Sequence, residues 1–354
     1  MGSSKGTGAS GKGAFTRRGA LVGGAALVAA PMVIGSARAA AEVTWKVQSH
    51  WPKASASYGD SLAIIAEELK ENTGGRFELQ LFGAGEFAKG GEIFNIVRRG
   101  VVEAGTISPG YILGEAPTAG LALGVPGTFR QPWEFSHFLK NMGFEAMFNE
   151  DLAKHGVATR SEKVYPTELV VAKEVATVDD FTKLKLRSSG SYQKYLEAAG
   201  ASTQYIAGPE LYQSLASGVV DGAHWGAAQG ADSMSLWEVA KFHMKPTMGL
   251  ASDVIIYNLD ALNALPEDLR REFLDLLEMR FWKRTNEYQY KEQVALAKGV
   301  AENDVVVADF PPAVLEGFAK ATKAILDEER AKGGNAEKGV DMLVAFMKVL
   351  GYPV

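Results

Sequence analysis

Apolar and polar residues alternate along this chain with two different periods. At residues 44–48 and 77–81 every second residue is apolar, which predicts two short strands. Between residues 62 and 69, and again between 93 and 97, apolar residues recur at helical spacing. Short strands separated by amphipathic helices are typical of an α/β fold with mostly parallel sheets. We therefore expect an α/β protein, and its length of 354 residues allows two lobes.

The longest helical pattern lies late in the chain. Pro266 followed by Glu267 and Asp268 is a favourable helix start, and helical character then continues to about Lys298. A helix of about thirty residues would span ~45 Å, which exceeds one lobe. We therefore expect this helix to brace both lobes. A last helix is predicted at residues 336–350.

One segment carries a candidate binding chemistry. Arg187 ends a short strand-like run and is followed directly by Ser188, Ser189 and Gly190, after which a helical segment begins. This order brings together a forked cation, two hydroxyl groups and the free N–H groups of a helix start, a set that suits a carboxylate. No nucleophile accompanies them, so the segment favours holding an anion over transforming it.

Charge and composition narrow the possible partners. The chain has 37 basic and 42 acidic residues, and five of the basic residues but none of the acidic ones precede Ala39. Without that segment the net charge falls from −5 to near −10, which argues against binding to nucleic acid or to an anionic membrane. The chain has no cysteine, which excludes disulfides, thiolate metal sites and cysteine nucleophiles.

Residues 1–39 have the pattern of a signal peptide. Arg17 and Arg18 precede an apolar run at residues 20–34, and Ala37-Arg38-Ala39 has the form of a cleavage site. The arginine pair indicates the twin-arginine export route, with the general secretory route as the alternative. We expect the mature protein to begin near Ala40 and to work in the periplasm.

Several segments in order resemble one family. These are the stretch from Val178 to Trp225, the Phe82-Gly83-Ala84-Gly85 turn and the closing DMLVAFMKVLGYP. Together they resemble the substrate-binding component (DctP type) of tripartite ATP-independent periplasmic (TRAP) transporters, and most of all its subgroup that binds 2-oxo acids and lactate. The resemblance implies two α/β lobes that close on a ligand by a hinge. It also implies delivery of the ligand to a sodium-driven membrane permease.

The resemblance also implies a division of the chain and a set of site residues. The N-terminal lobe would lie mainly in 40–165 and the C-terminal lobe mainly in 166–260, with 261–354 completing both. Arg187 matches the arginine that clamps the carboxylate in this family, and Trp51 and Tyr111 fall where aromatic side chains line the cleft. The expected ligand-binding residues are Arg187, Trp51, Tyr111, Ser189, His224, Trp225 and Met248. For His224 and Trp225, core packing is the alternative.

In the 2-oxo acid subgroup a metal ion bridges the protein and the ligand. The positions of its ligands fall on Val164, His224 and Met248 here, and valine and methionine cannot supply hard oxygen ligands. We therefore expect no metal and no other cofactor, and a larger or more apolar acid becomes an alternative to a 2-oxo or 2-hydroxy monocarboxylate. Dimers of this subgroup swap a helix beyond the point where this chain ends, so a monomer is expected.

Two other functions share parts of this evidence. A protein of the same architecture could be a sensor that passes its closed state to a signalling receptor. An exported lyase or isomerase acting on an acid is the third hypothesis. However, the chain has no H-E-x-x-H or G-x-S-x-G motif, and its glycines around residue 85 lack the spacing of a dinucleotide fingerprint. We therefore expect a binding protein rather than an enzyme.

Overall fold

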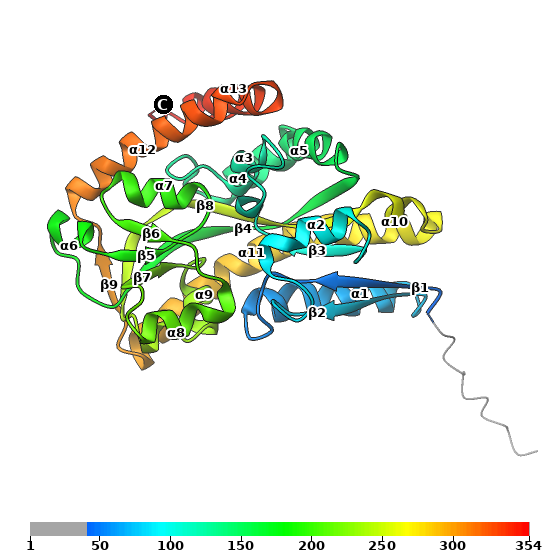
Figure 1. Ribbon diagram of the computed structural model, residues 1–354, viewed down its shortest axis with the longest axis horizontal. Helices are drawn as coiled ribbons and strands as arrows, with labels where there is room; N and C mark the ends of the chain where they lie inside the picture. Colours follow the sequence, from blue (N-terminus) through cyan, green and yellow to red (C-terminus); the bar gives the residue numbers. More distant parts are fainter. Residues whose placement is uncertain (1–40, 354) are drawn as a thin grey trace, which may run out of the picture. The chain divides into compact units, whose positions relative to one another are not determined.

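Nine strands form one sheet at the centre of the part that the computed structural model describes, residues 41–353 (Figure 1). The sheet order is β2-β1-β3-β8-β4-β7-β5-β6, and β9 pairs with β8. The strands are β1 (Val43–Gln48), β2 (Phe77–Phe82), β3 (Ala104–Ile107), β4 (Val157–Val171), β5 (Lys185–Arg187), β6 (Ser202–Gln204), β7 (Gly222–His224), β8 (Phe242–Asn258) and β9 (Val306–Asp309).

Helices cover this sheet and follow the strands in alternation along the first half of the chain (Figure 1). They are α1 (Ala63–Asn72), α2 (Ile93–Arg98), α3 (Ala119–Leu123), α4 (Pro132–Ser136), α5 (Phe144–Ala153), α6 (Val178–Thr182), α7 (Ser191–Ala198), α8 (Leu211–Ala216), α9 (Ala228–Ser233), α10 (Leu259–Asn263), α11 (Glu267–Glu302), α12 (Pro312–Ala331) and α13 (Gly334–Val349). The α/β prediction is confirmed. None of the helices in residues 41–353 is long and apolar enough to cross a membrane.

The sheet is parallel at its two flanks and antiparallel at its centre. β1 pairs in parallel with β2 and β3, and β5 pairs in parallel with β6 and β7. Between these two groups, the long strands β4 and β8 pair antiparallel with each other and with the adjacent flanking strands. The expected parallel character therefore holds for the flanks, while the centre is a long two-stranded antiparallel ribbon.

The register of the flanking strands sets where a site can form. β3 starts beside Tyr257 and ends beside Val254, so it runs toward the middle of β8. β7 starts beside Val171 and ends beside Leu169, so it runs toward the middle of β4. The carboxyl ends of both parallel groups therefore converge on the middle of the central ribbon. Such ends are where α/β sheets bind ligands.

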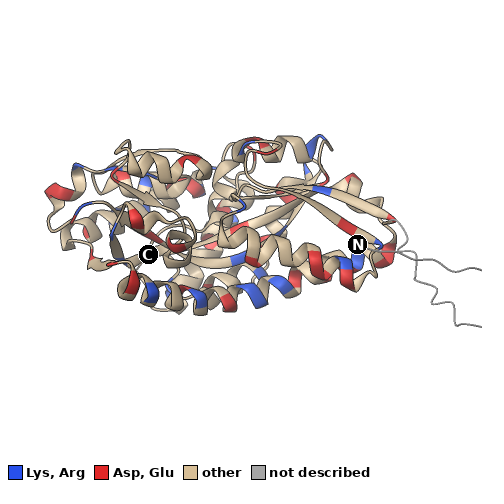
Figure 2. Ribbon diagram, turned by 90° about the horizontal axis from the view of Figure 1, so that it is seen from below, with Lys and Arg blue, Asp and Glu red and all other residues tan. Residues whose placement is uncertain are grey.

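The long helix α11 packs against three separate apolar clusters, as predicted for a bracing helix, and its middle contributes Phe281 and Tyr288 to the largest of them. Its first half contributes Leu269 and Phe273 to the cluster that holds Trp45, while Ala295 belongs to the cluster around Trp237. A Cβ on Gly299 would lie 2.6 Å from the Trp237 ring, so glycine allows this close packing. Charged residues of both signs mark the length of α11 (Figure 2). It has 36 residues instead of the expected thirty.

Other boundaries differ slightly from expectation. The predicted strands at 44–48 and 77–81 are β1 and β2, and the last helix begins at Gly334 instead of residue 336. β7 covers Gly222–His224, so His224 is its last residue. The predicted signal peptide lies outside the described residues, and the lobe boundaries near 165 and 260 stay predictions.

Candidate functional site: a cavity at the converging strand ends

A cavity of about 60 Å³ lies where the two strand groups converge. One wall is made by the carboxyl ends of β5 and β7 and the residues that follow them. The opposite wall is made by the residues after β1 and β3 together with the middle of β4 and β8, and Tyr288 of α11 also lines the cavity. Its lining residues are His50, Trp51, Ser55, Ala56, Ser57, Ser108, Tyr111, Leu123, Lys163, Tyr165, Arg187, Ser189, His224, Trp225, Gly226, Gly230, Ser233, Asp253 and Tyr288. One enclosed water needs about 10–15 Å³ of such space, so the cavity suits a small molecule.

Arg187 lies in one wall as a buried cation without a carboxylate partner. Its side chain donates from Nε to the Ile206 carbonyl at 3.0 Å and from Nη1 to the His224 carbonyl at 2.5 Å. Its guanidinium carbon lies 4.8 Å from the centre of the Trp225 ring. Arg187 is 2 % exposed and makes no ion pair with any residue in 41–353. Because a buried charge normally requires a counter-charge, this wall is suited to an anion.

The residues after Arg187 complete the same wall. Ser188 Oγ lies 3.0 Å from Nδ1 of His224, which orients the imidazole, and Ser189 lines the cavity. Burial, with a further contribution from the nearby Arg187, lowers the pKa of His224 to about 3, so its ring is neutral at neutral pH. Gly190 has φ +59°, and a Cβ there would lie 2.8 Å from Leu123. Glycine is therefore required at this turn.

The opposite wall holds a second buried cation, Lys163 of β4. Its Nζ lies 2.6 Å from Oε2 of Glu162 and 3.4 Å from Oδ2 of Asp253. The ammonium also lies 4.7 Å from the ring centres of Trp51 and Tyr165. Burial raises the pKa of Asp253, against the opposing effect of the nearby Lys163 charge. Unlike Arg187, Lys163 is already paired with carboxylates.

His50 is the neutral imidazole of this second wall. Its Nδ1 lies 2.9 Å from Thr106 Oγ1, and its Nε2 lies 3.7 Å from Asp253 Oδ1. Its ring packs against Trp51 and, edge-on, against Tyr111. Burial, followed by the nearby Lys163 charge, lowers the pKa of His50 to about 3. Each wall of the cavity therefore combines one buried cation with one neutral histidine.

Six of the seven expected site residues meet at this cavity. They are Arg187, Trp51, Tyr111, Ser189, His224 and Trp225, which come from both strand groups. Their roles in ligand binding stay predictions.

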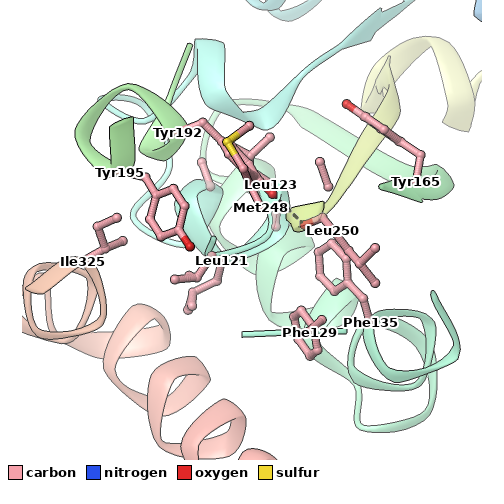
Figure 3. Packing of buried hydrophobic residues seen from close by; sticks show 14 of the residues in the cluster. Leu121, Leu123, Phe129, Phe135, Tyr165, Tyr192, Tyr195, Met248, Leu250 and Ile325 are labelled. Carbon is pink, nitrogen blue, oxygen red and sulfur yellow. Dashed lines mark hydrogen bonds between the residues drawn. The ribbon is translucent and has the colours of Figure 1, made fainter. Parts of the chain in front are cut away.

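The seventh, Met248, does not line the cavity. It is 2 % exposed and belongs to a packed apolar cluster with Leu123, Tyr192 and Leu250 (Figure 3). It falls in the irregular part of β8, between the residues paired with Leu169 and Thr167 of β4, where the register shifts.

Of the three positions expected to replace metal ligands, His224 lines the cavity but Val164 and Met248 do not. Val164 is fully buried in the apolar core and lies between Lys163 and Tyr165, which both line the cavity. Successive side chains of a strand point to opposite faces, so a shift of one position exchanges a core residue for a site residue. Because Val164 and Met248 both lie in the core, their apolar side chains no longer indicate a larger or more apolar acid.

Sequence reasoning missed Lys163, Asp253, Tyr165, His50 and Tyr288. A signal existed for two of them. Asp253 is the one charged residue between Gly249 and Asn258, and Lys163 lies in a strand that is otherwise mostly buried. Charged residues in fully buried strands are rare unless they are paired or functional.

The described residues do not fit a bound metal ion. A hard cation such as Ca²⁺ takes about six to eight oxygen ligands. Within residues 41–353, no group of three His, Asp or Glu side chains is placed to hold one. Asp253, the carboxylate among the lining residues, and its neighbour Glu162 both bind the Lys163 ammonium already.

Comparison with known proteins identifies the class to which this fold and cavity belong. Residues 48–332 match the model of the bacterial extracellular solute-binding protein family 7, DctP. The chain belongs to this family, whose members are solute-binding proteins that work outside the cytoplasm.

One curated relative and two solved structures are similar over most of the chain. The monocarboxylate 2-oxoacid-binding periplasmic protein of Nostoc sp. is 24 % identical over 324 residues, covering 86 % of this chain and 84 % of the relative. A TRAP periplasmic solute-binding protein from Colwellia psychrerythraea, with bound calcium and pyruvate, has a TM-score of 0.80 at 20 % identity, covering 87 % of this chain and 95 % of that one.

The second structure is an extracytoplasmic solute receptor from Bordetella pertussis that binds pyroglutamic acid. It has a TM-score of 0.77 at 19 % identity and covers 86 % of this chain and 99 % of that one. Both structural matches confirm the two-lobe TRAP receptor fold expected from the sequence.

Proposed function

We propose that this protein is the periplasmic receptor of a TRAP transporter and that Arg187 clamps the carboxylate of a small organic acid. One observation carries the proposal. Arg187 is a buried guanidinium that faces a cavity, is held by two backbone carbonyls, and has no carboxylate partner among residues 41–353. An incoming carboxylate would supply that partner and accept from the Nη2 group, which makes no hydrogen bond within the described protein.

The cavity supports a small, polar ligand. Its volume of about 60 Å³ suits only a few non-hydrogen atoms, and serines and histidines line it together with aromatic rings. Closure around the ligand would exclude water, which strengthens the pairing of its carboxylate with Arg187. The family also includes receptors for pyruvate and for pyroglutamic acid, so acids of this size are the first candidates.

Thermal unfolding of the mature chain with a panel of acids tests this proposal. Pyruvate, lactate and pyroglutamate are compared with neutral amides of the same acids. A ligand at a hundredfold excess over its Kd should stabilise the protein by about 2.7 kcal/mol. Arg187→Met should lose about 2–5 kcal/mol of binding free energy. The control Arg98→Met changes a partly exposed arginine and should bind as the wild type does.

A panel without any hit, or an amide that binds as well as its acid, would contradict the carboxylate site. Delivery to a sodium-driven permease is tested separately, by uptake of the labelled acid into vesicles that contain the membrane subunits. Uptake that needs the receptor supports transport, while unaffected uptake favours the sensor alternative. The monomeric state remains a prediction, and light scattering of the purified protein would decide it.

A further inference from the structure

Lys163 occupies an unusual position for a lysine. Its side chain is 1 % exposed, yet it lines the cavity that Arg187 faces. An ammonium has three N–H donors. Glu162 and Asp253 accept two of them, and no acceptor for the third is present among residues 41–353. The aromatic rings of Trp51 and Tyr165 hold the ammonium in place.

We propose that the Lys163 ammonium takes the place of a bridging metal ion in this cavity and donates a hydrogen bond to the oxygen next to the ligand's carboxylate. The ligands would then be 2-oxo or 2-hydroxy acids, bound without metal. This inference rests on the proposed function as a carboxylate receptor. It adds the residue that binds the part of the ligand next to the carboxylate. Arg187 binds the carboxylate from one wall, and Lys163 binds the neighbouring oxygen from the other.

The charges around Lys163 exclude a metal at the same place. Glu162 and Asp253 are the carboxylates that could hold a cation here, and both contact the Lys163 ammonium. A divalent ion would have to displace the ammonium or lie beside it, and two cations in a buried site repel each other strongly. The related Colwellia protein carries calcium together with pyruvate, so this chain supplies a covalently attached cation in a fold that elsewhere holds a metal.

The groups facing the ligand explain the choice of 2-oxo and 2-hydroxy acids. An ammonium only donates, so the ligand atom that meets Lys163 must be an acceptor, such as a ketone or hydroxyl oxygen. Asp253 lines the same cavity and accepts hydrogen bonds, so a 2-hydroxyl could accept from Lys163 and donate to Asp253. A ligand ammonium facing Lys163 would be repelled.

Two calorimetric titrations of the wild type test whether calcium binds in this cavity. In the first, calcium chloride is added to the chelator-treated protein alone. We expect no binding, and stoichiometric calcium binding that is lost in Asp253→Asn would overturn the inference. In the second, pyruvate and lactate are titrated with chelator or with added calcium. We expect the Kd to stay within about twofold, and binding that requires calcium would overturn the inference.

A comparison of ligands tests the contact itself. Propionate has the carboxylate but lacks the second oxygen. The wild type should prefer pyruvate or lactate over propionate by about tenfold or more, and Lys163→Met should close this gap. A merely structural lysine would weaken all three acids alike, and that result would overturn the contact. The control Lys173→Met changes an exposed lysine and should keep the wild-type preference.

Failure of this inference can be told apart from failure of the proposed function. If no acid binds the wild type in either buffer, the carboxylate receptor is wrong. If acids bind but require calcium, or if Lys163→Met folds and retains the preference for pyruvate, only the role of Lys163 is wrong. Where Lys163→Met does not fold, the two wild-type titrations decide.

Discussion

The two walls of the cavity are built alike but treat their cations differently. Each wall has a buried cation over a tryptophan ring, Arg187 at 4.8 Å from Trp225 and Lys163 at 4.7 Å from Trp51. Each wall also has a buried histidine, and burial lowers the pKa of this histidine to about 3. However, Arg187 is held by two carbonyls, whereas Lys163 contacts two carboxylates.

Within the described part of the chain, the charge of Lys163 is compensated by carboxylates of the protein, whereas the charge of Arg187 is not, and in our proposal a ligand compensates it. A buried cation without a counter-ion costs free energy in the empty protein, and an anionic ligand can offset that cost. A buried cation between carboxylates is compensated within the fold. It can donate to the ligand only the N–H group that has no acceptor among residues 41–353. In our two proposals, Arg187 decides that an anion binds and Lys163 decides which anion.

The largest expected effect is a difference in stability between Lys163→Met and Arg187→Met. Lys163→Met leaves Glu162 and Asp253 buried without their cation and should lower the free energy of unfolding by about 3–5 kcal/mol. Arg187→Met leaves no carboxylate unpaired and should cost only about 1 kcal/mol, from its two hydrogen bonds to carbonyls. Urea unfolding without ligand measures both. Equal losses would contradict the distinction between the two cations.

The next largest effect is the dependence of the free energy of unfolding on pH. His50 and His224, one in each wall, should contribute similarly to it. His50 and His224 keep a folded pKa of about 3, whereas an unfolded histidine titrates near its ordinary value of 6.5. As the pH falls below 6.5 the unfolded chain binds protons that the folded protein does not, so stability is lost until about pH 3. Near pH 5 each histidine should cost about 2 kcal/mol.

Urea unfolding of His50→Asn and His224→Asn between neutral and acidic pH measures these contributions, with the exposed His137→Asn as the control. Each buried variant should reduce the slope of stability against pH relative to the wild type. Burial is the largest cause of the lowered pKa at both positions, so the two reductions should be similar. A much larger reduction of the slope in one of the two variants would show that the neighbouring cation, and not burial, sets the pKa of that histidine.

The smallest expected effect concerns the tryptophan beneath Arg187. Trp225→Leu removes the ring that lies against the guanidinium and should weaken binding of the acid by about 1 kcal/mol. Trp133→Leu changes a tryptophan that is 56 % exposed and should leave the affinity unchanged. Calorimetric titration with the acid found in the panel measures both. An unchanged affinity in Trp225→Leu would mean that carbonyls alone position Arg187.

Local sequence patterns predicted the first two strands and helices, the long helix, the last helix and the segment that forms one wall of the site. The strand, turn and helix around Arg187 are adjacent in the chain, so β5, Ser188, Ser189 and α7 could be recognised from their order. The long helix α11 was predictable because its start signal and its period are local. The resemblance to a known family then placed Trp51, Tyr111 and Trp225, which come from different strand ends.

The sequence by itself thus determined the α/β class and the family, and it predicted Arg187 as the anion clamp. Only the tertiary structure decided the second wall, because Lys163 and Asp253 are ninety residues apart and meet only when β4 and β8 pair. It also decided that Lys163 and Tyr165 line the cavity while Val164 does not. Side chains alternate between the faces of a strand, so a shift of one residue in register exchanges the core for the site.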